Sequence, residues 1–231
     1  MSTYLQLCSQ LRQLATDSGT GPTTVASQTG ELARFVTWCA DYYTELQQER
    51  TDWLWLRKSF TVNTVAGTGE YAYTSCTDTA TSAAIARFSS WYKRSFKAYL
   101  SSGGVGGEYD LIWMDWDDFK RKYRFGTQTD GVPRHVSMDP TMKFALGPKP
   151  DAVYVVSGDF NKGPQVLAAD ADEPEMPSRF HKLVAYGALM KYGLHRVAPE
   201  AIQLAQIEGA RLRFALERDQ LPPITTGGSL A

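Results

Sequence analysis

A short acidic stretch that ends in a histidine is the first place where residue types and spacing could do chemistry. Within DADEPEMPSRFH the ionisable side chains include Asp170, Asp172, Glu175 and His181. Carboxylates and an imidazole that converge on one point can bind a metal ion or transfer protons. The other two histidines, His135 and His195, offer neither HxxH nor HxxxH spacing to complete such a set. A metal or acid–base site is therefore the weaker interpretation.

The same stretch is typical of the start of a helix. Pro177 or Ser178 is suited to open it, and the preceding acids would lie near the positive end of its dipole. Apolar residues then recur at helical spacing as far as Leu194. We therefore interpret His181 as a helix-entry residue, and we predict no metal, no cofactor and no catalytic residues.

Clustered glycines in SSGGVGGEYD, residues 101–110, suggest a second chemistry, because the backbone N–H groups of such a loop can point at a phosphate. The segment lacks a following Lys-Ser/Thr pair and does not match G-x-G-x-x-G. It also leads into a strand-like run rather than a helix. The glycines are therefore predicted to form the tip of a hairpin.

Basic and aromatic residues are interleaved in DWDDFKRKYRF, residues 115–125, as on some surfaces that bind single-stranded nucleic acid. A short helix explains the same pattern, because Asp117 and Asp118 would lie in its first turn and the cations near its end. Phe119 and Tyr123, four residues apart, would give that helix one buried side. The helix is favoured. The alternative is a basic surface lining a DNA passage, formed by Lys120, Arg121, Lys122 and Arg124.

The rest of the sequence gives no positive case for an enzyme, since no residue lies in a nucleophile motif such as G-x-S-x-G. Cys8, Cys39 and Cys76 are widely spaced and form no CxxC, which suits reduced thiols in a cytosol. The formal net charge of −1 argues against sequence-specific DNA binding. With no signal peptide and no apolar run near the ~20 residues of a membrane span, we expect a soluble protein.

Hydrophobic periodicity predicts helices near both ends of the chain. The expected helices cover about 3–17, a stretch beginning near Thr29, a stretch beginning at Pro177 or Ser178, and one in which Pro199 occupies the first turn. Between them, alternating patterns predict three strand pairs. These pairs lie around AGTGE between Phe60 and Tyr73, between 94–100 and 108–114, and within MKFALGPKPDAVYVV, residues 142–156.

Clustered strands flanked by helices, without alternation of strand and helix, predict the α+β class. We expect a helical bundle built from 1–50 and 177–220, with an inserted β-rich, sheet- or sandwich-like domain over 51–176. A flexible C-terminal tail is expected over 221–231, because the double proline of LPPITTGGSLA ends the last helix and little apolar surface follows.

The order of several motifs resembles the head-to-tail adaptor proteins of tailed bacteriophages. SFKAYLSSGGVGGEYDLIWMDWDDFKRKY resembles the family's strand, loop, strand and W-x-x-F-(K/R)-x-x-Y helix. LGPKPDAVYVVSGDF, followed by PEMPSRFHKLVAYGALMKYG, is similar to its Gly-Pro-x-Pro-Asp hairpin and its Phe-His helix entry. WLWLR after the second helix also fits. The resemblance spans about 29–195.

The resemblance implies a structural virion protein of the head–tail junction, made in the cytoplasm of a host bacterium. Such adaptors form a dodecameric ring beneath the portal protein, extend the channel through which genomic DNA passes non-specifically, and dock a tail or nozzle protein. No membrane is involved. Lys120, Arg121, Lys122 and Arg124 would line the channel or face the tail.

The same resemblance implies that the C-terminal tail docks on the portal. The residues expected to make this contact are Leu221, Pro222, Pro223, Ile224 and Leu230. Exposed aromatic side chains would serve contacts between subunits, and the tryptophans of TDWLWLR and LIWMDW are the candidates. Two alternatives stay open: a tail-tube or tail-terminator protein, for which fewer helices are expected, and an uncharacterised hydrolase with a site assembled from distant residues.

Overall fold

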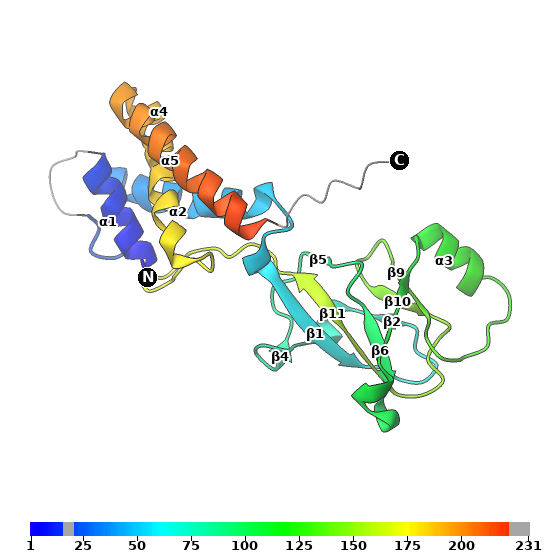
Figure 1. The fold of residues 1–231 in the computed structure, drawn as a ribbon. Helices are drawn as coiled ribbons and strands as arrows, with labels where there is room; N and C mark the ends of the chain where they lie inside the picture. The colour runs from blue at the N-terminus through cyan, green and yellow to red at the C-terminus, as the bar shows by residue number, and fades with distance from the viewer. Residues whose placement is uncertain (16–20, 222–231) are drawn as a thin grey trace, which may run out of the picture. The chain divides into compact units, whose positions relative to one another are not determined.

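The computed structural model describes residues 1–15 and 21–221 and divides the chain into two compact units (Figure 1). The helical unit runs up to Leu56 and resumes at Pro164, and the β unit is Arg57–Gly163. Helices lie toward both ends of the sequence, and the strands lie in its middle. The α+β class predicted from the sequence is therefore confirmed.

Four long helices build the described part of the helical unit. They are α1 (Tyr4–Leu14), α2 (Gly30–Glu49), α4 (Lys182–Arg196) and α5 (Pro199–Gln220). Helix α4 packs against each of the other three, so it lies at the centre of their shared apolar core. Gly187 permits a close approach of α4 to α2, because a Cβ at this position would lie 2.2 Å from the ring of Tyr42.

The helix boundaries follow local chemistry. The hydroxyl of Thr3 accepts the N–H of Gln6, whose side chain accepts the N–H of Thr3, so α1 begins with a capping box. Two predicted starts are confirmed, since α2 follows Thr29 directly and α5 begins at Pro199. The first predicted helix is confirmed over Tyr4–Leu14 only.

Two sheets make up the β unit. The described part of the larger sheet has the order β4-β3-β1-β11-β6-β7, and β5 also pairs with β11. Its strands are β1 (Arg57–Asn63), β3 (Thr77–Asp78), β4 (Ala83–Ala84), β5 (Ser90–Trp91), β6 (Lys97–Leu100), β7 (Tyr109–Asp110) and β11 (Tyr154–Asn161).

The smaller sheet has the order β2-β10-β9-β8. Its strands are β2 (Glu70–Tyr71), β8 (Ile112–Trp113), β9 (His135–Met138) and β10 (Phe144–Gly147). The pairs within it are antiparallel except for β8 with β9, which is parallel. Helix α3 (Trp116–Tyr123) connects these last two strands along the chain.

An aromatic core joins the two sheets. Phe60 of β1 and Phe144 of β10 are both fully buried, and their ring centroids are 6.0 Å apart. Trp91 lies between the same residues, 4.6 Å from Phe60 and 5.3 Å from Phe144. Burial of such large rings supplies much of the free energy that holds a small β unit together.

Two predicted hairpins are wrong. Around AGTGE, β1 pairs with β11 and β3 in the larger sheet, whereas β2 pairs with β10 in the smaller one. In MKFALGPKPDAVYVV, β10 and β11 likewise belong to different sheets. The Gly-Pro-Lys-Pro-Asp turn therefore carries the chain from one sheet to the other. Alternation tells which face of a strand is apolar, but it does not tell which strand lies beside it.

The strand pair predicted between 94–100 and 108–114 is confirmed in its first half. Strand β6 pairs with β7 in antiparallel fashion, with Lys97 opposite Asp110. The glycine-rich segment between them forms two short 3-10 helices, Ser101–Gly103 and Val105–Gly107, at the tip of this hairpin. The second half of the run becomes β8 and joins the smaller sheet.

The expectation of exposed tryptophans is wrong. Trp53 is fully buried and stacks on the nearly buried Trp55, with ring centroids 4.4 Å apart. Trp113 and Trp116 are half-buried. These rings serve the interior of their own units, because burying a large ring contributes more there than exposing it. Cys8, Cys39 and Cys76 are buried free thiols, in accord with the prediction of reduced cysteines.

Candidate functional site

The acidic stretch before α4 makes hydrogen bonds to its own preceding turn and to the segment that precedes α2. Asp172 accepts two backbone N–H groups of the preceding turn, at 2.7 and 2.8 Å, and these bonds lower the pKa of its carboxyl group. Asp170 accepts the N–H of Val25 at 2.6 Å and the hydroxyl of Thr24 at 3.1 Å. Both carboxylates therefore hold neighbouring backbone segments in place by accepting their N–H groups. Within the described residues, no three His, Cys, Asp or Glu side chains gather as a metal-binding set.

His181 is buried at the helix entry, where the sequence placed it. A 3-10 turn, Ser178–Phe180, precedes it, and α4 begins at Lys182. A neutral ring protonated at Nε2 satisfies both of its neighbours: Nδ1 accepts the N–H of Ser2 at 3.2 Å, and Nε2 donates to the carbonyl of Met176 at 3.0 Å. The imidazole thus joins the N-terminus to the start of α4.

Replacing His181 should test this structural role. The amide of His181→Gln offers one donor and one acceptor, so we expect a loss of about 1–2 kcal/mol in the free energy of unfolding. His181→Leu leaves both backbone partners unmatched and should cost ~1–3 kcal/mol more. Urea unfolding followed by circular dichroism measures both values. Stoichiometric zinc in the wild type that disappears in His181→Gln would contradict a purely structural role.

The basic run lies on α3, as the helix interpretation predicted, with Asp117 and Asp118 in the first turn. Its cations are largely paired inside the β unit: Lys120 with Asp117, Arg121 with Asp118, and Arg124 with Glu70. Lys122 lies 5.3 Å from the ring centroid of the adjacent Tyr123. Exposed pairs of this kind contribute only ~0–1 kcal/mol each to stability. They do neutralise most of the positive charge that a DNA-binding surface needs.

Helix α3 is anchored through its aromatic side. Phe119 is buried, and the hydroxyl of Tyr123 donates to Nδ1 of His135 at 2.7 Å. The ring of Tyr123 packs on Gly147, where a Cβ would come within 2.4 Å of it. Burial and the nearby charge of Lys122 lower the pKa of His135, which favours the neutral ring, and the tautomer protonated at Nε2 leaves Nδ1 free to accept this bond.

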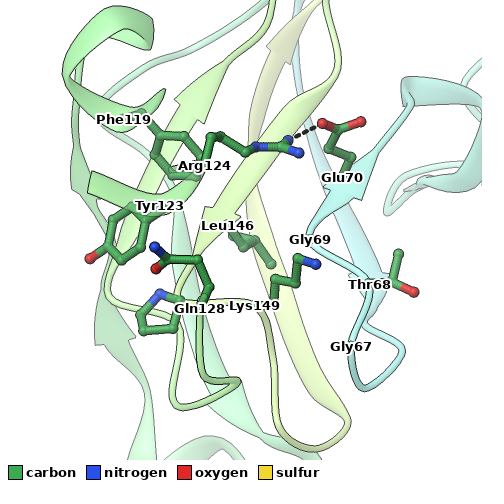
Figure 2. Close-up of a pocket in the computed structure, with 11 residues that line it drawn as sticks. Gly67, Thr68, Gly69, Glu70, Phe119, Tyr123, Arg124, Gln128, Leu146 and Lys149 are labelled. Carbon is green, nitrogen blue, oxygen red and sulfur yellow. Dashed lines mark hydrogen bonds and ion pairs between the residues drawn. The ribbon is translucent and has the colours of Figure 1, made fainter. Parts of the chain in front are cut away.

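A pocket of about 390 Å³ opens beside this helix (Figure 2). It is bounded by the loop 67–70, by the C-terminal half of α3, and by the segment 146–149, and we call it the β2–α3 pocket. Buried Phe119 and Leu146 form apolar parts of its wall. Glu70, Arg124, Gln128 and Lys149 supply polar groups, so the pocket combines an apolar wall with a rim that carries charges of both signs.

The sequence does not indicate this pocket. Arg124 belongs to a basic run in the sequence, but its partner Glu70 lies 54 residues earlier in the chain. Lys149 lies in a segment that the sequence assigned to a hairpin turn. The sequence shows a glycine-rich turn, AGTG, and a turn of glycine and prolines, GPKP, but it does not show that the two turns meet in space.

Comparison with known families decides what kind of protein this is. A family model described as SU10 adaptor protein matches residues 2–226, nearly the whole chain. The chain belongs to the SU10 adaptor protein family. No match is found among curated proteins. The adaptor is a structural protein of a phage virion, and its family implies contacts with portal and tail components. The match favours this interpretation over a tail-tube protein or a hydrolase.

The adaptor's last helix exposes apolar side chains. On α5, Leu204, Ile207 and Phe214 are 38%, 59% and 67% exposed. Together with Ala210 they lie on one side of the helix, and we call them the α5 stripe. Only Ala205 and Leu216 of α5 are buried. Helix α5 therefore packs through one narrow side and leaves the α5 stripe exposed within the described residues.

The predicted portal-docking residues of the adaptor are described in part. Leu221 is partly buried against the helical core, and its N–H donates to the carbonyl of Glu217 at 3.0 Å. Pro222, Pro223, Ile224 and Leu230 lie outside the described residues. No helix within 1–15 and 21–221 has the length and apolar character needed to cross a membrane.

Proposed function

We propose that this adaptor forms a dodecameric ring beneath the portal protein, extends the DNA channel and docks a tail or nozzle protein. The observation that carries the proposal is the family match over residues 2–226. The near-neutral formal charge of −1 supports a conduit role, because a strongly basic wall would retain the DNA that must pass. The ion pairing of Lys120, Arg121 and Arg124 supports the same role for α3, whether it lines the channel or faces the tail.

We assign the α5 stripe to the neighbouring subunit. In a closed ring each subunit buries two different faces, since one face binds the next copy and the other binds the previous one. Exposed Ile207 and Phe214 supply the large apolar side chains that the centre of such an interface needs. The portal contact is assigned to the helical unit through residues 221–231, and the tail contact to the β unit.

Electron microscopy of the purified adaptor with and without its portal tests the ring. We expect monomers or small oligomers for the adaptor alone and complete rings on the portal. A stable closed dodecamer of the adaptor alone at nanomolar concentration would contradict portal-dependent assembly. Failure to bind the portal at all would contradict the proposed function.

The variant Phe214→Asp tests the α5 stripe. A charge in the centre of an apolar subunit contact must be buried without a partner, so ring occupancy on the portal should fall by at least tenfold. The melting temperature should stay unchanged, because Phe214 is 67% exposed in the subunit. Val105→Asp is the matched control: Val105 is 65% exposed in the β unit, and its replacement should leave ring occupancy at the wild-type level. Equal ring occupancy for the two variants would show that the α5 stripe is not part of the interface between subunits.

A further inference from the structure

Lys149 brings an unmatched positive charge to the β2–α3 pocket. Its ammonium group has no hydrogen bond or ion pair with any residue in the described ranges, whereas Arg124 is paired with Glu70. The stem of Lys149 lies against Gly69, where an added Cβ would come within 3.1 Å of its Cγ. Lys149 as a whole is exposed, so its ammonium group stays accessible at the edge of the pocket. In Figure 2, Lys149, Gln128 and Arg124 are arranged around the same hollow.

Hydrogen-bond donors with spare capacity lie around this hollow, beside the Glu70 carboxylate that Arg124 already meets. Lys149 offers three N–H donors, and Arg124 retains N–H groups beyond the one that meets Glu70. The amide nitrogen of Gln128 is already engaged with a backbone carbonyl. A ligand that complements this set must bring acceptors, and a carboxylate brings the strongest ones.

The floor of the pocket suits a short aliphatic stem. Leu146 and Phe119 line the hollow but are only 2% and 1% exposed, so the half-buried Tyr123 and Pro148 supply its accessible apolar surface. A ligand with a carboxylate at the end of one or two methylene groups would place its apolar part on these side chains and its charge beside Lys149. Asp and Glu side chains have this form.

We propose that the β2–α3 pocket binds a single carboxylate-bearing side chain, Asp or Glu, presented by an extended segment of a protein partner. That this partner is the tail component rests on the proposed function. Carboxylate binding by the pocket does not depend on it.

A protein carboxylate fits the local charge better than a DNA phosphate does. Glu70 lines the pocket, and the carboxylate of Asp130 lies 3.6 Å from the position that a Cβ of Gly67 would occupy. These two negative groups would repel the continuous phosphate row of a nucleic-acid strand. One carboxylate inserted beside Lys149 meets the unmatched cation and avoids most of this repulsion.

The contact of one side chain is weak by itself. A lone carboxylate in a partly exposed pocket is expected to bind with a Kd on the order of millimolar. Repetition around a ring multiplies such contacts through effective concentration. A weak pocket in each subunit is therefore sufficient for docking a symmetric partner.

Titration of the full-length adaptor with the peptide Ac-Gly-Glu-Gly-NH2 tests the proposal. We expect saturable shifts of the backbone amide signals of residues 67–70 and of the Gln128 side chain in ¹H–¹⁵N spectra. Lys149→Met should weaken binding at least fivefold, because it removes the unmatched cation and keeps the stem. Lys143→Met is the matched control: this exposed lysine precedes β10, does not line the pocket, and should leave the affinity unchanged.

Two further probes separate the alternatives. Ac-Gly-Gln-Gly-NH2 has the same shape without the charge, and equal shifts with it would overturn the requirement for a carboxylate. Dimethyl phosphate represents a DNA backbone, and tighter binding of dimethyl phosphate than of the glutamate peptide would replace the proposed ligand by a phosphodiester. Absence of saturable shifts in the wild type would show that the β2–α3 pocket does not bind a carboxylate. These outcomes involve no portal, so they are independent of the test of ring assembly.

Discussion

An adaptor that ends after Leu221 is expected to keep its fold and lose its attachment to the portal. Leu221 and the end of α5 retain their contacts with the helical core in this variant, so the melting temperature should stay nearly unchanged. The deleted residues carry two large apolar side chains, Ile224 and Leu230, separated by the polar and glycine residues TTGGS. A segment with so little apolar surface gains more by binding a groove on a partner than by packing on its own unit.

The expected loss of portal attachment is large because every subunit of the proposed ring carries the same tail. In the proposed ring each tail contributes a weak contact and these contacts act together, so we expect removal of every tail at once to abolish attachment. Sedimentation of adaptor with portal rings measures occupancy. The full-length double variant Ile224→Ser, Leu230→Ser is the control for chain length, and it should fail in the same way as the truncation. Wild-type occupancy of the truncated adaptor would place the anchor elsewhere.

Phe144→Ala should be the most destabilising single change in the β unit, with a loss of about 3–5 kcal/mol in the free energy of unfolding. The Phe144 ring is fully buried, with centroids of Tyr71 at 5.4 Å, Trp91 at 5.3 Å and Phe96 at 5.4 Å. These neighbours come from both sheets, so they cannot all close on the cavity that the substitution leaves. The free energy lost with the burial of the ring and the free-energy cost of the residual cavity add to each other.

Denaturant unfolding followed by tryptophan fluorescence measures this loss, because Trp91 contacts the deleted ring. Phe214→Ala is the control: it deletes the same ring from a site that is 67% exposed, and it should change stability by less than about 0.5 kcal/mol. A similar unfolding midpoint for Phe144→Ala and the wild type would show that the two sheets do not share a core.

Local chemistry made the helices predictable. Pro199 marks a helix start because its missing N–H is not needed in the first turn. Thr29 directly precedes α2, although its side chain makes no capping hydrogen bond. The charges of α3 were also placed correctly, since first-turn acids and last-turn cations interact with the dipole of their own helix. His181 was found at a helix entry, but its bond to Ser2, at the other end of the chain, was not foreseeable.

Strand pairing was only partly predictable. The β6–β7 pair was found because a short glycine-rich tip joins its strands. The longest pairing of the β unit runs from Arg57 opposite Asn161 to Asn63 opposite Val155, and it joins segments about a hundred residues apart in the chain. Many strands of similar alternation compete for such a partner, and the choice depends on which rings fill the common core.

By itself, the sequence determined the fold class, the helix positions and, through the order of its motifs, the adaptor family. These properties depend on short stretches of chain, where spacing and capping act over a few residues. The tertiary structure alone decided which strands share a sheet, that Trp53 lies inside, and that Arg124, Glu70 and Lys149 surround one pocket. Such juxtapositions depend on packing between distant segments, and no local pattern records the free energy of that packing.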